Sequence, residues 1–219
     1  MNPAERRNVP PSRATLQAQA SRRRIIIFTS LAVVAIGVLV AFGVANRVPQ
    51  SASTAPISAQ LSIGQQAPEF VVSTTQGPFD LAQARGKPTL LEVFATWCPH
   101  CQRETVVLDR LFDTYKNRAH FVAVGGSPYD ITGRNPETQA DVIAFATRFG
   151  VRYPVAFDSN LGVAKSYLQS GFPTLVLIGA DGRVQSIASG EVAQGDIASA
   201  LAASAAGRRP DPKMGARGA

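Results

Sequence analysis

Cysteine and histidine are scarce in this chain. Of its 219 residues two are cysteine and two are histidine, and both cysteines, Cys98 and Cys101, lie in one short motif. A structural zinc site takes about four such ligands, and the sequence offers no second cysteine pair. A scaffold of several disulfides is excluded by the same count. Any sulfur chemistry in this protein therefore belongs to a single place in the sequence.

Charged side chains are absent from residues 25–45, which consist mainly of Ile, Val, Leu, Ala, Phe and Gly. A helix of that length is about 31 Å long and spans the hydrocarbon core of a bilayer once. Six arginines and one acid precede this run, whereas Arg47 is the only charged residue after it up to Gln66. The positive charge predicts a cytoplasmic N-terminus and an extracytoplasmic chain after Asn46. A cleaved signal peptide is the alternative, with small residues at 51–53 for cleavage, although its apolar core is usually shorter.

The net charge of +7 and the pI near 10 originate at the two ends of the chain. Beside the N-terminal arginines, four bases lie in the Gly- and Pro-rich C-terminus, namely Arg208, Arg209, Lys213 and Arg217. Between residues 48 and 207 acids slightly outnumber bases, so this part has no basic surface for nucleic acid. Topology and anionic lipid head groups explain the N-terminal arginines. We expect no nucleic-acid partner.

Composition divides the chain into five segments. They are a basic cytoplasmic tail (1–24), a transmembrane helix (25–45), a flexible linker (46–61), a globular domain (62–206) and a disordered tail (207–219). Within the domain, strands are expected at 69–73, 89–95, 121–125, 174–178 and 183–189. Helices are expected after Cys98 and at 136–149, 161–168 and 192–205, where apolar side chains recur every three or four positions; in the second, Val142, Ile143 and Phe145 should face inward. This alternation, ending in an antiparallel strand pair, predicts an α/β fold with a mixed sheet flanked by helices.

The two cysteines follow an apolar strand and open a helix. Residues 89–101 read TLLEVFATWCPHC. Cys-x-x-Cys on the first turn of a helix places both thiols on one face, close enough to form or open a small disulfide. Redox chemistry is the favoured interpretation. Half of a zinc site and a structural staple are the alternatives, although so short a staple constrains the unfolded chain very little.

Three features together resemble the thioredoxin fold. They are the WCPHC motif after its strand, Phe172-Pro173-Thr174 further along the chain, and the closing hairpin with its helix. The apolar N-terminal run, the opening at 64–70 and the insertion around residues 153–155 resemble membrane-anchored TlpA/ResA-type thiol-disulfide oxidoreductases. The resemblance implies a thioredoxin-like domain that exchanges disulfides with proteins, with no cofactor and no metal.

Position suggests a role for each residue of the motif. Cys98 is expected to be the nucleophile, because the N-terminal end of a helix favours a thiolate, and Cys101 to be the resolving thiol. Pro99 suits the first helical turn, where its missing N–H needs no partner. His100 is expected to donate a hydrogen bond or add positive charge to the Cys98 thiolate, which would make the disulfide more oxidising. Trp97 is expected to shield Cys98, with plain core packing as the alternative.

Four further residues are candidates for the site. Glu92 lies where thioredoxin-like proteins carry a buried acid beneath the second thiol, so a proton relay to that thiol is expected; pairing with a base such as Lys87 is the alternative. Glu104 matches a family acid near the site, and an ordinary surface ion pair explains it equally well. Pro173 resembles the family's cis-proline. Phe172 before it is bulkier than the family leads one to expect, and would offer a platform for an unfolded segment or cover the disulfide.

The sequence thus favours an extracytoplasmic thiol-disulfide oxidoreductase, held in the inner membrane by one span and acting as a protein-disulfide reductase. Its expected partners are protein thiols and disulfides and a membrane electron donor or acceptor. A DsbA-like disulfide-forming oxidase is one alternative, because Pro99-His100 resembles the dipeptide of those enzymes. A metal-carrying binding module is another, since thiolates suit Cu(I). A peroxidase of the same superfamily would use a separate thiol, which this sequence lacks.

Overall fold

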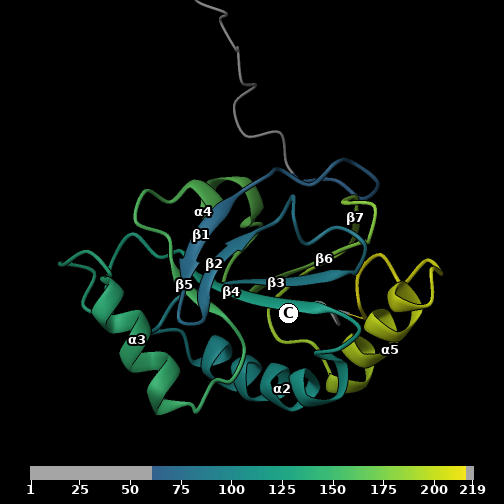
Figure 1. The fold of residues 1–219 in the computed structure, drawn as a ribbon. Coiled ribbons are helices and arrows are strands. Elements are labelled where there is room, and N and C mark those ends of the chain that lie inside the picture. The colour runs from purple at the N-terminus through teal and green to yellow at the C-terminus, as the bar shows by residue number, and fades with distance from the viewer. Residues whose placement is uncertain (1–60, 216–219) are drawn as a thin grey trace, which may run out of the picture. The chain divides into compact units, whose positions relative to one another are not determined.

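The computed structural model describes residues 61–215 (Figure 1). The predicted basic tail, transmembrane helix and nearly all of the linker lie outside the described residues, as do residues 216–219. Among the helices of residues 61–215, none combines the length and the apolar character needed to cross a membrane. The boundaries of the predicted basic tail, transmembrane helix and linker therefore stay predictions.

Strands and helices alternate along the described chain. The strands are β1 (Val71–Thr74), β2 (Gly77–Asp80), β3 (Thr89–Phe94), β4 (His120–Gly125), β5 (Val155–Phe157), β6 (Thr174–Ile178) and β7 (Val184–Ser189). The helices are α2 (Pro99–Tyr115), α3 (Gln139–Arg148), α4 (Gly162–Tyr167) and α5 (Gln194–Ala205). The strands form one sheet in the order β2-β1-β5-β4-β3-β6-β7, with β3, β4 and β5 parallel and the other pairings antiparallel. The predicted thioredoxin-like α/β fold with a mixed sheet is confirmed.

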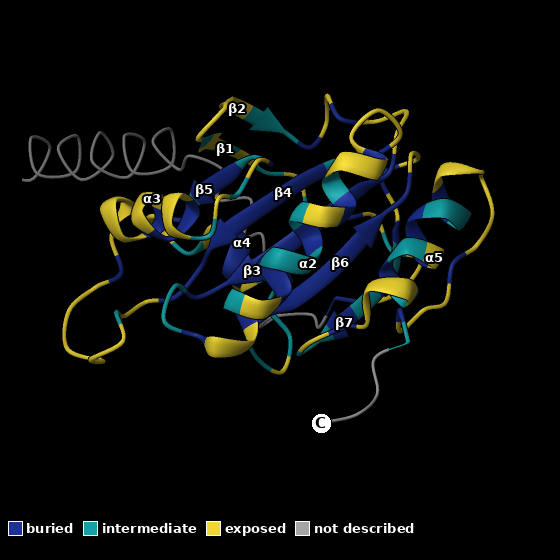
Figure 2. Cartoon of the chain, turned by 90° about the horizontal axis from the view of Figure 1, so that it is seen from below, coloured by how far each residue is buried: buried dark blue, intermediate teal, exposed yellow. Residues whose placement is uncertain are grey.

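Helices cover both faces of the sheet, and each face has its own core (Figures 1 and 2). Helices α2, α3 and α5 pack on one face and α4 packs on the other. All six residues of the central strand β3 are buried. Because side chains alternate along a strand, Leu90, Glu92 and Phe94 face α2, whereas Leu91 and Val93 face α4. The strand that leads to the cysteines therefore also places an acid under the helix that carries them.

Strands β2 and β5 were not expected from the sequence, and one side chain that was expected to face inward is exposed. Strand β5 has three residues, too few to show an alternating pattern. Strand β2 contains Gly77 and Pro78, which disfavour strands but are tolerated at the edge of the sheet that β2 occupies. Ile143, expected to face inward, is 47% exposed, while Val142 and Phe145 are buried. A helix as short as α3 buries a narrower stripe than its apolar pattern suggests.

The C-terminal segment also differs from the predicted disordered tail. Its described part packs against β7: the N–H of Ile187 donates to the carbonyl of Pro212 at 2.9 Å, and Ser186 Oγ donates to that of Asp211 at 2.5 Å. Met214 is 1% exposed and belongs to the core beneath α2 and α5. The segment covers an edge strand with backbone hydrogen bonds, which need no apolar pattern in the sequence.

Candidate active site

The two cysteines lie at the start of α2, just after the end of β3. Cys98 is the N-cap residue, and its Sγ accepts a hydrogen bond from the backbone N–H of Cys101 at 3.4 Å. Pro99 follows in the first turn and is exposed, as predicted. Both thiols are free, and Cys98 and Cys101 are 4% and 0% exposed. Residues 61–215 contain no group of three or more His, Cys, Asp or Glu side chains placed to hold a metal ion.

The loop before β6 also contacts Cys98, through Phe172. The Phe172–Pro173 peptide bond is cis, as the family resemblance implied. The Cys98 thiol donates to the carbonyl oxygen of Phe172, 3.6 Å away. The Phe172 ring contacts Trp97 edge to face, with 6.1 Å between the ring centroids. Phe172 thus contacts Cys98 with its backbone and Trp97 with its ring.

Trp97 is fixed by the long loop that joins β4 to α3. Its indole N–H donates to Ser127 Oγ and to the carbonyl oxygen of Tyr129, each at 3.0 Å. Ser127 is buried, and its hydroxyl in turn donates to the same carbonyl at 2.6 Å. Core packing alone therefore does not account for Trp97, because its indole N–H is hydrogen-bonded to the loop between β4 and α3.

Glu92 is fully buried in β3. Its Oε2 accepts a hydrogen bond from the hydroxyl of Tyr153 at 3.3 Å, and its Oε1 has no hydrogen-bond partner among the described residues. Burial raises the pKa of Glu92 well above its ordinary value, and the charge of Glu104 raises it further. The alternative of a surface ion pair with Lys87 is wrong. The proton relay stays a prediction, and this placement supports it.

Cys101 and Glu92 interact electrostatically. Burial raises the pKa of the Cys101 thiol, and the charge of Glu92 raises it further. The thiol therefore keeps its proton at neutral pH, and a reaction of this sulfur as a thiolate would need a base to accept that proton. Glu92, whose own pKa is raised toward that of the thiol, is a suitable acceptor.

Glu104 lies one turn beyond Cys101 and is 1% exposed. Its Oε2 accepts a hydrogen bond from the backbone N–H of Val192 at 3.1 Å, while its Oε1 has no partner among residues 61–215. Burial raises its pKa to about 7, and the charge of Glu191 adds to the effect. The surface ion pair considered for Glu104 is wrong, and the two carboxylates Glu92 and Glu104 form one buried acidic pair beneath the cysteines.

The structure places His100 differently from the prediction. Its side chain is 60% exposed, and its Nδ1 lies 2.6 Å from Glu191 Oε1 and 3.0 Å from Arg103 Nη2. The hydrogen bonds of the Cys98 sulfur are those with Phe172 and Cys101, described above. The imidazole is therefore bound to a carboxylate on a neighbouring loop instead of to the thiol.

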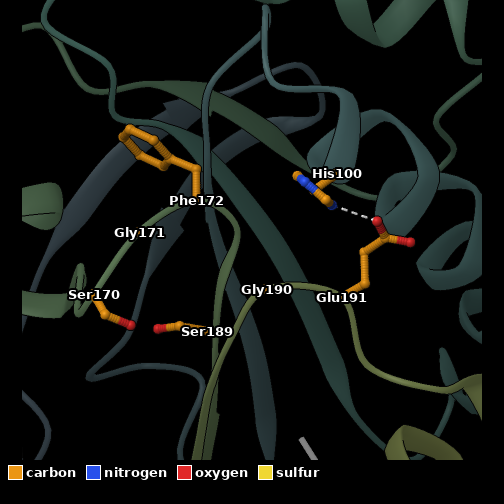
Figure 3. A pocket seen from close by; sticks show the side chains of 7 residues that line it. All are labelled: His100, Ser170, Gly171, Phe172, Ser189, Gly190 and Glu191. Atoms are coloured by element: carbon orange, nitrogen blue, oxygen red, sulfur yellow. Dashed lines mark hydrogen bonds and ion pairs between the residues drawn. The ribbon is translucent and has the colours of Figure 1, made fainter. Parts of the chain in front are cut away.

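A pocket of about 440 Å³ opens beside the first turn of α2 (Figure 3). It is lined by His100, Phe172, Glu191 and the segments 170–171 and 189–190. In Figure 3 the joined side chains of His100 and Glu191 border one side, and Phe172 borders another. Glycine and serine supply the remaining lining, so backbone groups are accessible there. The pocket is connected to Cys98 through Phe172, whose carbonyl oxygen accepts the hydrogen bond from the Cys98 thiol.

Sequence reasoning missed three charged residues at the site, namely Arg103, Glu137 and Glu191. Glu137 is 3% exposed, and its Oε1 accepts hydrogen bonds from the Thr96 backbone N–H at 2.8 Å and the Thr96 hydroxyl at 2.6 Å. Burial raises its pKa. It fixes the turn that leads from β3 to Cys98. No local pattern marks it, because it lies 41 residues away from Thr96 in a polar loop.

Known proteins match the folded part of this chain. The Redoxin family profile matches residues 62–203. The thiol-disulfide oxidoreductase ResA of Geobacillus thermodenitrificans is 32% identical over 139 residues, which cover 63% of this chain and 75% of the relative. ResA of Bacillus anthracis is 30% identical over 127 residues, covering 57% of this chain and 68% of the relative.

Solved structures share the fold. A thioredoxin family thiol:disulfide interchange protein from Chlorobium tepidum has a TM-score of 0.53 at 24% identity, over 67% of this chain and 99% of that chain. A secreted Mycobacterium tuberculosis disulfide oxidoreductase homologous to E. coli DsbE has a TM-score of 0.52 at 22% identity, over 61% and 95%. These two likenesses concern the fold alone, and the sequence matches decide the membership. The chain belongs to the Redoxin family and, within it, to the ResA-type thiol-disulfide oxidoreductases.

Proposed function

We propose that this protein is a membrane-anchored reductase of protein disulfides that works outside the cytoplasm. The observation that carries the proposal is the layering of the site. Cys98 lies at a helix N-terminus beside the Phe172 carbonyl, and Cys101 lies below it with the buried Glu92. A polypeptide disulfide that enters the pocket reacts with Cys98 first, and Cys101 reacts only in the second step.

In the first step the Cys98 thiolate attacks one sulfur of the substrate disulfide. A bond forms between Cys98 and that sulfur, the substrate S–S bond breaks, and the second substrate sulfur leaves as a thiolate that takes a proton from solvent. Unpaired N–H groups of the first turn of α2 favour the negative charge on Cys98 before the attack. The small serine and glycine residues of the pocket lining leave room for an extended substrate backbone.

In the second step Cys101 resolves the mixed disulfide. Its proton passes to Glu92, its sulfur bonds to Cys98, and the first substrate sulfur leaves as a thiolate. The substrate gains two electrons and the enzyme is left with a Cys98–Cys101 disulfide. A dithiol donor must then return two electrons to the enzyme, and for an anchored protein a membrane protein is the natural supplier.

The reducing direction is favoured over the DsbA-like alternative by the position of His100. An imidazole bonded to the Cys98 thiolate would stabilise the reduced form and make the disulfide more oxidising. Here the imidazole is bonded to Glu191. Cellular placement is supported by the apolar run at residues 25–45 and the arginines before it.

Two measurements on the full-length protein test the proposal. The first is the reduction potential of the Cys98–Cys101 pair in mild detergent, by equilibration with glutathione and dithiothreitol. A potential near −270 mV, about that of thioredoxin, agrees with a reductase, whereas about −120 mV would identify an oxidant of the DsbA type. The second is the activity of alkaline phosphatase fused after residue 219, because this reporter needs disulfides and is active only outside the cytoplasm. An inactive, stably expressed fusion would contradict the location.

A further inference from the structure

Glu191 connects the loop after β7 to the first turn of α2 through a single oxygen atom. Its Oε1 lies 2.6 Å from Nδ1 of His100, and it accepts hydrogen bonds from Nε and Nη2 of Arg103 at 2.9 and 2.5 Å. The three side chains are partly exposed, at 60% for His100, 57% for Arg103 and 38% for Glu191. One carboxylate oxygen thus contacts two basic side chains at the start of α2, the helix that carries the cysteines.

The backbone on either side of Glu191 is also fixed. The N–H of Gly190 donates to the carbonyl oxygen of Pro173 at 2.8 Å, and the N–H of Val192 donates to the buried Glu104 at 3.1 Å. Gly190 has φ of +85°, a conformation that favours glycine. The loop is therefore tied to the proline beside Cys98 and to the inner face of α2. The contact of Glu191 with the outer face of α2 follows from a rigid frame and is not a chance meeting of surface side chains.

The guanidinium of Arg103, which Glu191 holds, interacts electrostatically with the Cys98 sulfur as well as with Glu191. Arg103 and His100 both lower the pKa of Glu191, Arg103 more strongly, so the carboxylate stays ionised through the neutral range. Without that carboxylate, a guanidinium and an imidazole next to the cysteines would be free to turn toward the thiolate.

We propose that Glu191 is a positioning residue that keeps the cysteine pair reducing, by holding His100 and Arg103 on its own carboxylate and away from the Cys98 thiolate. The inference deepens the proposed function and rests on it in one respect, that the pair works as a reductase. The effect of Glu191 on the redox equilibrium depends only on where these side chains lie, so it is expected whether the cysteine pair acts as a reductase or as an oxidase.

The equilibrium with glutathione measures this role. Two glutathione thiols are oxidised to one glutathione disulfide, and the enzyme disulfide takes up their two electrons; one proton goes to Cys101, and the other goes to Cys98 or, where Cys98 remains a thiolate, to solvent. Anything that stabilises the Cys98 thiolate raises the equilibrium constant for enzyme reduction. Removing the charge of Glu191 should therefore raise this constant.

The experiment compares full-length wild-type protein with Glu191→Gln at pH 7 and low ionic strength. We expect the constant to rise about threefold, which is the scale of one partly exposed ion pair. Glu191→Asp, which keeps the charge, should stay closer to wild type than Glu191→Gln. Glu69→Gln is the matched control, because it removes one carboxylate from the exposed ion pair with Arg85, outside the site. It should leave the constant unchanged.

A second set of variants shows whether Glu191 acts through its partners. His100→Gln and Arg103→Gln should each change the constant little in the wild-type background, but each should reverse part of the rise in the Glu191→Gln background. The rise should also shrink at 1 M salt, because exposed charges are screened there. A change caused only by a disturbed loop would not depend on salt or on these partners.

Two results would overturn the inference: an unchanged constant in Glu191→Gln, or a rise that persists in full when both partners are also replaced. Either result would leave the proposed function intact if the wild-type potential is near that of thioredoxin. Conversely, a wild-type potential near that of DsbA together with a salt-dependent rise in Glu191→Gln would refute the reductase and retain the role of Glu191.

Discussion

Replacing Glu104 with glutamine should make the stability of this protein less dependent on pH. Glu104 is buried, and its pKa of about 7 compares with an ordinary value of 4.5. Glutamine has nearly the same shape and retains a carbonyl oxygen for the N–H of Val192, which Glu104 accepts at 3.1 Å. The substitution therefore removes the ionisation of this side chain and keeps its structural hydrogen bond.

The sign and the size follow from proton linkage. Since the pKa of Glu104 is raised in the folded state, the unfolded chain releases its proton first, and the wild-type protein loses stability as the pH rises from about 4.5 to about 7. Each unit of pKa shift corresponds to about 1.4 kcal/mol, so the loss approaches about 3 kcal/mol at pH 8. A glutamine side chain does not titrate. The free energy of unfolding of Glu104→Gln relative to wild type should therefore rise by about 3 kcal/mol between pH 4.5 and pH 8.

The assay is urea unfolding of the reduced full-length proteins at pH 4.5, 6, 7 and 8, followed by circular dichroism. Comparing the difference between the two proteins at each pH cancels the titration of groups that do not interact with Glu104, and any constant cost of the buried amide drops out. Glu69→Gln provides a control, since it alters an exposed carboxylate and should give a difference that does not vary in this way. A difference for Glu104→Gln that stays flat between pH 4.5 and 8 would refute the argument that burial shifts this carboxyl.

Three further substitutions probe other parts of the structure. Glu92→Gln should slow the release of substrate by Cys101 about 100-fold or more, so that the mixed disulfide accumulates in a quenched-flow experiment; an unchanged rate would exclude the relay. Glu137→Ala should lower the free energy of unfolding by about 1 to 3 kcal/mol, because two donors of Thr96 lose their acceptor, whereas Glu137→Gln should recover most of the loss. Met214→Ala should cost about 2 kcal/mol or more in urea unfolding, since this side chain is 1% exposed; an effect below about 0.5 kcal/mol would show that the C-terminal segment does not dock.

Local signals in the sequence predicted the central part of the fold and the reactive pair. The apolar run of β3 and the proline after Cys98 mark a strand followed by a helix, and the structure has both at those residues. The strand and the helix depend on neighbours in the chain, and a single sequence displays them directly. The buried acid at Glu92 was implied by the resemblance to thioredoxin-like proteins, and the structure buries this side chain.

Features made by distant residues escaped prediction. Glu191 lies 91 residues from His100, and their contact exists because the antiparallel pairing of β6 with β7 returns the chain to the start of α2. The predicted bond from His100 to Cys98 was based on their adjacency in the sequence. In the structure His100 instead contacts the carboxylate of Glu191, which the tertiary fold brings next to it. Pairing of Ile187 with Pro212 likewise depends on an exposed sheet edge, which no composition reveals.

We expect the rate of resolution and the reduction potential to depend on side chains on two different faces of the start of α2. Residues three apart on a helix share a face. Cys101 and Glu104 therefore both lie on the buried face of α2, whereas His100 and Arg103 lie on its outer face and contact Glu191. If Glu92 relays a proton as proposed, substitutions on the inner face should change the rate at which Cys101 resolves the mixed disulfide. Substitutions on the outer face should change the charge next to Cys98 and therefore the reduction potential. One loop contacts both faces, through Glu191 outside and the N–H of the next residue inside, and the charge of Glu191 also raises the pKa of Glu104. Changes in this loop should therefore alter rate and potential together.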